Sequence, residues 1–391
     1  MSSVSGPTGS QSSLREANSE RILATVRQFG SITQVELSQA TGLSPATVST
    51  IVKQLLTAGT VETRHTVRSG RRAQLVTLAH KAGMLVGLHV GERSLRVAIS
   101  DSQFQFLEQR EMPLPADHRH DTTLDRAALL VSELVDGLGS TLSEVLAIGI
   151  AVPAPVDPAT GAISIPGILP GWENIPLAEV VGRRLGRLAA VDNDANLGLL
   201  GEMRFGAARG INNVLYVRAS YGVGAGIALA GDIHHGVLGI AGEVGHTLVD
   251  PQGLICRCGS RGCLNTVCGA QALVASLRQS RGTVTLTDVL RLAGEGDPGC
   301  EQVVIDAGGT LGAVVANTAV SLSPEVIVVG GELAQAGTLF IEPIREFVRR
   351  RIPLAKSQTL EVLPAQLGLD AELYGALARA ADLAHVPSMA S

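Results

Sequence analysis

The sequence predicts an α/β protein in two parts, a winged helix-turn-helix domain followed by a larger α/β body. Three observations indicate this organisation. Residues 1–80 hold eight Lys and Arg but four Asp and Glu, a net charge of +4, whereas the rest of the 391-residue chain carries −9. The basic part contains amphipathic helical patterns, and the acidic part alternates strand-like runs with helical stretches. Four of the five cysteines lie within thirteen residues of the acidic part.

The chain begins with a polar segment that has neither a basic patch nor an apolar stretch, so it does not resemble a secretory signal. We expect residues 1–16 to form a disordered tail and residues 17–80 to form the DNA-binding domain. Apolar residues at helical spacing predict a first helix from Asn18 to Phe29, which Gly30 ends.

The next residues predict the helix-turn-helix itself. Thr33 and Glu36 form a capping box at the start of a short helix, and a turn at Gly42 follows. Ser44 is expected to cap a third helix with Pro45 at its first position. In this plan the last helix enters the major groove of DNA. The candidate DNA contacts on it share an outward polar face: Ser44, Thr47, Ser49, Thr50 and Lys53.

Two extended runs then flank the basic tip R-S-G-R-R, which predicts a β-hairpin wing. Arg68, Arg71 and Arg72 are candidates to contact phosphates or a narrow minor groove. Double-stranded operator DNA is therefore the expected partner. The alternative is a small helical domain whose basic loop contacts another protein.

Residues 81–391 read as one α/β body, because strand-like runs alternate with helical stretches such as 124–138 and 302–320. No apolar run approaches the roughly 20 residues of a membrane span, so a membrane protein is not expected. The strand-like runs are 84–90, 95–101, 145–152, 214–219 and 326–331.

The cysteine spacing predicts a metal site. His246, Cys256, Cys258 and Cys263 offer one imidazole and three thiolates, a closed set of soft ligands that suits structural zinc. Such a local cluster favours a reducing cytoplasm over a disulfide framework. The alternatives are buried reduced cysteines, or Cys268 as the fourth sulfur.

Two polar clusters are candidates for binding hydroxyl groups. Asn193 and Asp194 lie in V-D-N-D-A-N, where Asp194 can accept a hydroxyl hydrogen bond or, in an enzyme, act as a general base. Glu243 precedes His246 in G-E-V-G-H, and a carboxylate beside a metal-fixed imidazole suits vicinal sugar hydroxyls. The alternatives are an Asx turn or helix cap for the first cluster and a surface carboxylate for Glu243.

These motifs, with C-R-C-G-S-R-G-C-L at 256–264 and Y-G-V-G-A-G-I at 221–227, resemble the ROK family of repressors and sugar kinases from about Gly83 to Ala381. The winged helix-turn-helix matches the repressor branch, which includes xylose and N-acetylglucosamine repressors. The resemblance implies a two-lobed actin-like ATPase (ribonuclease H-like) body with a sugar in its cleft. It implies that Asn193, Asp194, Glu243 and His246 hold the sugar. It also implies structural zinc on His246, Cys256, Cys258 and Cys263.

The chain departs from the kinases of this family at the nucleotide motifs. The kinases have Asp-x-Gly-Gly-Thr where this chain has 89–93, H-V-G-E-R, so Glu92 opposes a polyphosphate. The second phosphate loop reads Gly-Val-Gly at 222–224 in place of Gly-Thr-Gly, and Glu332 follows the glycines of the adenosine loop. We therefore expect no enzyme activity, and Asp194 is a catalytic base only in the kinase alternative.

The family commonly has a glutamate two residues after the last zinc cysteine, and this chain has Asn265 there, as a further sugar-binding candidate. The predicted function is a sugar-responsive transcriptional regulator, a repressor that acts as a homodimer or higher homo-oligomer on operator DNA. The alternatives are a sugar kinase with an appended DNA-binding domain and a protein-scaffolding module.

Overall fold

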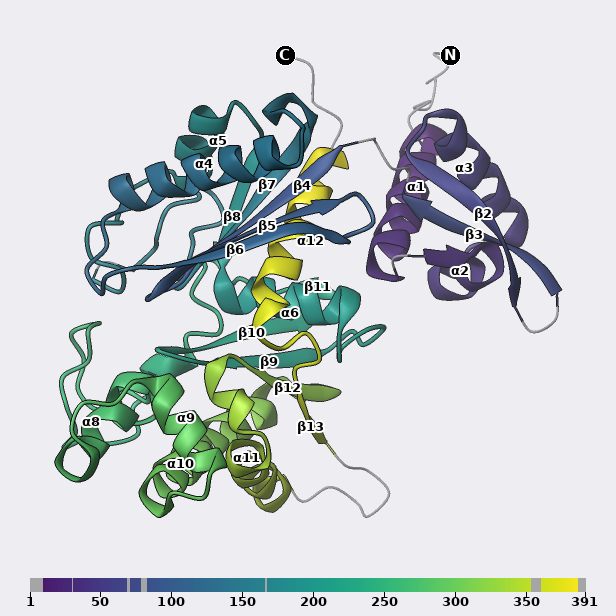
Figure 1. The fold of residues 1–391 in the computed structure, drawn as a ribbon. Coiled ribbons are helices and arrows are strands. Elements are labelled where there is room, and N and C mark those ends of the chain that lie inside the picture. The colour runs from purple at the N-terminus through teal and green to yellow at the C-terminus, as the bar shows by residue number, and fades with distance from the viewer. Residues whose placement is uncertain are drawn as a thin grey trace, which may run out of the picture. The chain divides into compact units, whose positions relative to one another are not determined.

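The computed structural model describes residues 10–29, 31–68, 71–78, 83–165, 167–352 and 360–385. The chain divides into two compact units, Met1–Ala82 and Gly83–Ser391 (Figure 1). The fold class is the predicted one, α/β with an N-terminal winged helix-turn-helix.

The first unit packs three helices on a small sheet. Its helices are α1 (Ser10–Phe29), α2 (Gln34–Thr41) and α3 (Pro45–Thr57). The strands β1 (Ser31–Thr33), β2 (Val61–Arg68) and β3 (Arg71–Leu78) form an antiparallel sheet in the order β1-β3-β2. Strands β2 and β3 are the predicted wing. The apolar faces meet in one core, which includes Ile22, Val26, Leu37, Val48, Ile51, Val52 and Val76.

Helix α1 begins at Ser10, eight residues before the predicted start at Asn18. Residues 10–16, expected to belong to a disordered tail, therefore lie on this helix, and residues 1–9 lie outside the described residues. Leu14-Arg-Glu-Ala are good helix formers, so a helix that is anchored downstream in the core extends through them.

The second unit contains two sheets with the same strand order. The first sheet runs β6-β5-β4-β7-β8 and the second runs β11-β10-β9-β12-β13. In each sheet, the strand that comes first in the chain lies in the middle. On one side of it, two strands are joined by antiparallel pairing, and on the other side two strands are joined by parallel pairing. The strands are β4 (Met84–Val90), β5 (Ser94–Asp101), β6 (Phe106–Pro113), β7 (Val145–Val152), β8 (Ala189–Asn193), β9 (Val214–Ala219), β10 (Val223–Leu229), β11 (Asp232–Ile233), β12 (Val326–Gly330) and β13 (Glu361–Pro364).

Helices cover both sheets and fill the space between them. Helices α6 (Asp194–Phe205) and α12 (Ala371–His385) lie between the two sheets (Figure 1). Helices α4 (His120–Gly137) and α5 (Leu177–Leu185) share a core with the first sheet. The second sheet is covered by a helical layer of α7 (Asn265–Cys268), α8 (Ala270–Arg281), α9 (Leu286–Gly294), α10 (Pro298–Leu322) and α11 (Thr338–Arg351).

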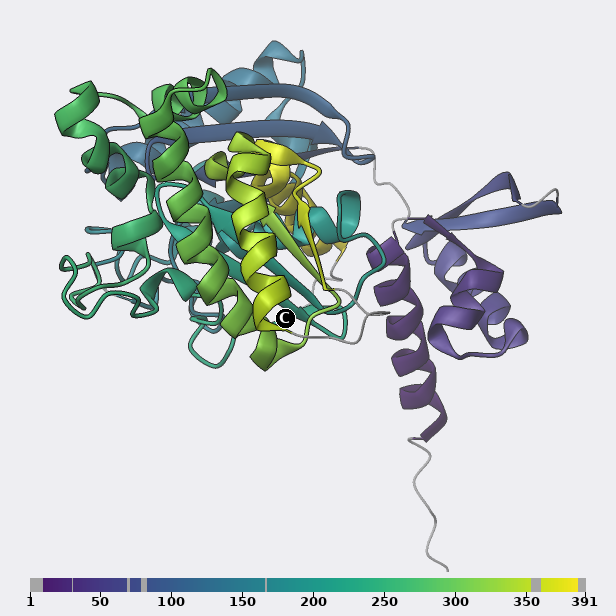
Figure 2. The ribbon, with the colours of Figure 1, turned by 90° about the horizontal axis from the view of Figure 1, so that it is seen from below.

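In the described part of the chain, α10 is the one helix long and apolar enough to cross a membrane. Half of its most apolar window is buried, and it packs along α11 over the second sheet (Figure 2). Its Val304, Leu311 and Val315 belong to the core of that layer. The helix therefore has the packing of a core helix, and its small residues raise its mean hydropathy without a continuous apolar run.

Candidate ligand cleft and metal centre

A cleft of about 370 Å³ lies in the second unit, between residues of its two lobes. Its walls come from the β4–β5 turn, the start of α6, the β9–β10 turn and the loop that carries the cysteines. The volume is in the range of small-molecule sites. The residues predicted to bind a sugar all line this cleft: Asn193, Asp194, Glu243, His246 and Asn265.

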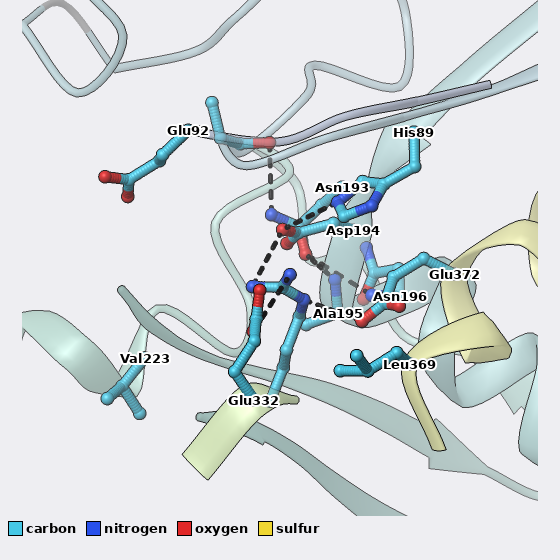
Figure 3. A network of polar contacts seen from close by, with 12 residues as sticks. His89, Glu92, Asn193, Asp194, Ala195, Asn196, Val223, Glu332, Leu369 and Glu372 are labelled. Atoms are coloured by element: carbon cyan, nitrogen blue, oxygen red, sulfur yellow. Dashed lines mark hydrogen bonds and ion pairs between the residues drawn. The ribbon is translucent and has the colours of Figure 1, made fainter. Parts of the chain in front are cut away.

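Asn193 caps α6, so most of its amide is used by the protein. Its Oδ1 accepts hydrogen bonds from the backbone N–H groups of Ala195 (2.8 Å) and Asn196 (3.3 Å). Its Nδ2 donates to the Ala154 carbonyl at 3.1 Å (Figure 3). One amide hydrogen remains for a ligand, so Asn193 is both a helix cap and a cleft residue.

Asp194 is buried at the first position of α6 and faces two cationic or titratable groups. Arg218 Nη1 lies 3.3 Å from its Oδ2, and His89 Nε2 lies 3.9 Å from the same atom. Burial by itself would raise the pKa of Asp194, but Arg218 and His89 outweigh burial and lower it. Asp194 is therefore an anionic hydrogen-bond acceptor and a weak base.

Glu243 and Asn265 complete the cleft from the other side. Burial and the nearby Asp194 charge raise the pKa of Glu243 to about 7. Its Oε2 lies 3.8 Å from Nε2 of His246. Asn265 begins α7, and its Oδ1 accepts a hydrogen bond from the backbone N–H of Val223 at 2.7 Å. Asn265 thus holds the β9–β10 turn and presents its Nδ2 as a donor.

The four predicted metal ligands meet in one cluster. The ligand atoms of His246, Cys256, Cys258 and Cys263 all lie within 4.8 Å of one another. His246 Nδ1 is 3.6 Å from Cys256 Sγ, and Cys258 Sγ is 3.7 Å from Cys263 Sγ. A tetrahedral centre with bonds of about 2.3 Å separates its sulfurs by about 3.8 Å, so the cluster can hold a metal ion.

The local backbone and the thiol chemistry explain why these groups converge. Gly262 has φ +70°, and a Cβ there would lie 1.6 Å from the Asp250 carbonyl oxygen, so the loop needs glycine. In the protein alone, burial and hydrogen bonds with neighbouring sulfurs raise the pKa of Cys263 to about 12. The Cys263 thiol therefore needs a bound cation to form a thiolate at neutral pH.

The remaining two cysteines lie elsewhere. Cys268 is buried and donates from Sγ to the Ala307 carbonyl at 3.4 Å, and burial raises its pKa to about 12. Cys300 is buried in the core of the helical layer. Neither belongs to the metal cluster in the described part of the chain, which removes Cys268 as the alternative fourth sulfur.

An ion pair connects the metal loop with the opposite wall of the cleft. Arg257, between two of the cysteines, has its Nη2 3.0 Å from Oε2 of Glu92 in the β4–β5 turn. Its Nη1 donates to the Ile168 carbonyl at 3.3 Å. Glu92 also lies close to Gly222, since a Cβ at Gly222 would be 3.3 Å from its Oε1. Glu92 therefore extends its carboxylate from the β4–β5 turn toward Gly222 of the β9–β10 turn.

A second ion pair, between His235 and Asp192, holds the turn that carries Asn193, and its contribution to stability depends on pH. His235 Nε2 lies 2.7 Å from Oδ2 of Asp192, and this hydrogen bond raises the pKa of His235 against partial burial and Arg379. Because the folded pKa exceeds the unfolded one, the stabilisation is full below about pH 6.5 and is lost as pH rises through the folded value.

We expect His235→Gln to lower the free energy of unfolding by less than about 1 kcal/mol near neutral pH, because the pair is partly exposed. The loss should be larger at about pH 6 than at about pH 9, as measured by urea denaturation. His234→Gln is the matched control, because His234 is exposed and should give no pH-dependent difference. A loss that grows with pH would contradict the prediction.

The candidate DNA contacts of the first unit lie on and before α3. Ser44 Oγ caps α3 by accepting from the Thr47 N–H at 3.1 Å, and Thr50 Oγ1 donates to the Ala46 carbonyl at 2.9 Å. Ser44, Thr50 and Lys53 are exposed. Ser49 is half-buried, as is Thr47.

The predicted wing contacts lie at the end of β2 and the start of β3. Arg68 ends β2, and Arg71 begins β3 with Arg72 next to it. The side chains of these three arginines lie outside the described residues, so their contacts with DNA stay a prediction.

Two charged residues, Arg218 in the cleft wall and its buried partner Glu372, were not predicted from the sequence motifs. Arg218 stands in the apolar strand V-L-Y-V-R-A, and a buried arginine requires carboxylate partners, so its position was a usable signal. Glu372, whose Oε1 accepts from Arg218 Nε at 2.6 Å, is 154 residues away at the start of α12. Nothing local in the sequence indicates that pairing.

Comparisons with known proteins agree with this geometry. A family model described as ROK family matches residues 85–382, and one described as winged helix-turn-helix DNA-binding matches residues 15–62. A putative xylose repressor of Caldicellulosiruptor sp. is 27% identical over 387 residues, with 95% of this chain and 96% of that protein covered. A glucokinase of Halalkalibacterium halodurans is 32% identical over 313 residues, with 74% of this chain and 92% of that protein covered.

Two solved structures differ in the same way, since the regulator aligns with nearly the whole chain and the kinase with about three quarters of it. A ROK family transcriptional regulator, a homologue of the Escherichia coli MLC protein, has a TM-score of 0.75 at 26% identity and covers 95% of this chain, with 96% of its own chain covered. A ROK family glucokinase from Streptomyces griseus, in complex with glucose and AMPPNP, has a TM-score of 0.69 at 28% identity. It covers 77% of this chain and is itself covered fully. The chain belongs to the ROK family.

Proposed function

We propose that this protein is a sugar-responsive transcriptional repressor, in which residues 17–80 bind operator DNA and residues 81–391 bind the sugar. The observation that carries the proposal is the complete winged helix-turn-helix ahead of the ROK body. Regulators of the family align with 95% of the chain, whereas the glucokinases align with about three quarters of it. The DNA contacts are those predicted on α3 and the wing.

The charges in the cleft support binding of a neutral sugar over phosphoryl transfer. Glu92 occupies the turn between β4 and β5, and His89 replaces the carboxylate that the kinases of the family have there. Asp194 is held anionic by Arg218, which lowers its strength as a base. Arg93, Arg218 and Arg257 also line the cleft, but the Glu92 carboxylate stands in the turn that a polyphosphate must approach and opposes it there. The cleft carboxylates accept hydrogen bonds from sugar hydroxyls.

The sugar contacts in this proposal are Asn193, Asp194, Glu243, His246 and Asn265. Zinc is the metal that best fits one imidazole and three thiols, and its role is to hold His246 rigidly at the cleft. Reduced thiols and a DNA target both favour action in the cytoplasm. A homodimer would present two α3 helices to a pseudo-palindromic operator.

The test measures DNA binding and ATP consumption on the same protein. The protein is titrated into labelled DNA fragments from the promoter region of its own gene, and binding is followed by fluorescence anisotropy, with and without D-xylose, D-glucose or N-acetyl-D-glucosamine. We expect salt-dependent DNA binding, a change in affinity with one sugar, and no sugar-dependent ATP consumption. Asp194→Asn should keep DNA binding and lose the sugar response.

The second candidate is a sugar kinase with an appended DNA-binding domain, which the retained Asp194 favours. Brisk ATP turnover on a hexose that Asp194→Asn abolishes would establish the kinase and refute the proposal. DNA binding that no carbohydrate alters would also refute it.

A further inference from the structure

One guanidinium holds together three acidic side chains beside the cleft. Arg218, at the end of β9, directs each of its three nitrogens to a different carboxylate. Nε donates to Oε1 of Glu372 at 2.6 Å, Nη1 lies 3.3 Å from Oδ2 of Asp194, and Nη2 lies 3.8 Å from Oε2 of Glu332. We call the three carboxylates the acidic triad; Figure 3 shows them converging from separate elements.

The acidic triad is buried enough that it requires a cation. The side chains of Arg218, Asp194 and Glu372 are 9%, 7% and 3% exposed, and Glu332 is 31% exposed. Three carboxylates in so small a volume repel one another strongly in a medium of low dielectric constant. Oxygen ligands from several chain segments around one positive charge are also the arrangement by which proteins bind divalent cations.

The three carboxylates come from three separate elements of the body. Asp194 begins α6, and Glu372 is the second residue of α12, which packs on α6, β4 and β7. Glu332 begins the 3-10 helix Glu332–Ala336 directly after β12 of the second sheet. Arg218 therefore links the Asp194 carboxylate to both lobes of the body.

Within this arrangement, the Oδ2 atom of Asp194 still has hydrogen-bond acceptor capacity for a ligand. Among the residues that the structure describes, no donor makes a hydrogen bond of good geometry to its buried Oδ2. The nearby Arg218 and His89 give charge compensation at 3.3 and 3.9 Å, and a donor from a ligand would complete the hydrogen bonding.

We propose that Arg218 is the positioning residue of the cleft: its guanidinium takes the place of a divalent cation in the acidic triad and presents Asp194 to a ligand hydroxyl without a metal ion. The cation replacement stands on the geometry alone. The presentation of Asp194 to a sugar hydroxyl rests on the proposed function.

The first test uses Mn²⁺ alone and no sugar. Free Mn²⁺ is measured by electron paramagnetic resonance while the zinc-loaded protein is titrated. Arg218→Ser should bind one more Mn²⁺ than the natural protein, because three uncompensated carboxylates then face a space that the side chain has left. Arg218→Lys should show no gain, since it keeps the internal charge.

Two further variants make this result specific. Arg218→Ser with Glu372→Gln should weaken the new Mn²⁺ site on the order of tenfold or more, because a neutral amide replaces one carboxylate. Arg204→Ser is the matched control: Arg204 Nη2 pairs with Asp382 of α12 at 2.7 Å, outside the cleft, and should give no Mn²⁺ site. No gain in Arg218→Ser, or an equal gain in Arg204→Ser, would overturn the cation replacement.

If Arg218→Ser does not fold in metal-free buffer, refolding decides the question. The proposal requires Mn²⁺ to restore folded Arg218→Ser but not the double variant with Glu372→Gln, as followed by circular dichroism. Failure of Mn²⁺ to restore it would overturn the proposal.

The second test measures the positioning of Asp194, with D-xylose, D-glucose and N-acetyl-D-glucosamine as probes in buffer without divalent cations. Arg218→Ser should weaken the binding of the responsive probe on the order of tenfold or more, and Arg218→Lys should restore part of it. Unchanged affinity in Arg218→Ser would overturn the positioning role. If no probe binds the natural protein, the proposed function fails, while the Mn²⁺ result still stands by itself.

Discussion

Cys263→Ala is expected to release the bound metal and to destabilise the body on the order of 4 kcal/mol or more. Cys263 is buried, and its backbone connects the metal loop to the cleft: the Cys263 carbonyl accepts from Thr266, and Leu248 forms a β-bridge with Cys263. Without the metal, the cluster loses the bonds that hold His246 to the loop 256–263, and the remaining thiols and His246 keep only weak hydrogen bonds.

The measurement combines metal content by elemental mass spectrometry with thermal unfolding, before and after a chelator. Cys300→Ala is the matched control, because Cys300 is a buried cysteine outside the cluster and its loss removes packing but no ligand. We expect one metal ion per chain in the natural protein and in Cys300→Ala, and a sharp decrease in Cys263→Ala. Equal metal content and equal chelator sensitivity in the three proteins would refute the metal site.

Gly375→Val is expected to prevent α12 from packing and to leave little folded body. A Cβ at Gly375 would lie 1.7 Å from the backbone carbonyl oxygen of Leu197 in α6, and backbone cannot move aside as a flexible side chain does. Gly149 in β7 makes the same close approach to α12, since a Cβ there would lie 1.9 Å from the Ala376 carbonyl oxygen. The expected cost exceeds about 4 kcal/mol, which is exceptional for one substitution.

Solubility and urea denaturation measure this effect. Gly294→Ala is the matched control, because a Cβ at Gly294, at the end of α9, meets no atom within 4 Å. The control should be neutral or slightly stabilising. A folded Gly375→Val protein with natural stability would show that α12 does not pack as closely as described.

The elements that the sequence predicted best are those with a strong local signal. Strands β7 and β9 have the predicted limits, because they are continuous apolar runs. The capping box at Thr33 and the proline start of α3 are also as predicted, since both depend on residues within one turn. Strand β6 was not predicted: its sequence F-L-E-Q-R-E-M-P is charged and mostly exposed at the edge of the first sheet.

The candidate sites also differ in how strongly the local sequence indicates them. The metal cluster was predictable because three of its ligands lie within eight residues and glycines set the loop between them. The acidic triad was not, because its carboxylates come from α6, from the 3-10 helix Glu332–Ala336 and from α12, and they meet Arg218 of β9 only in the folded body. Asn265 was predicted as a sugar contact on family resemblance, and the structure adds its hydrogen bond to Val223.

The position of α12 has a consequence for the order in which the chain matures. Helix α12 closes the inner face of the first sheet, where it packs on β4 and β7, which precede it by more than 200 residues. A ribosome-bound chain therefore exposes that apolar face until α12 has been synthesised, whereas the first 82 residues have their own core and can fold early. The winged helix-turn-helix can therefore fold before the body does, and the uncovered apolar face of the first sheet is open to intermolecular contacts until α12 packs on it.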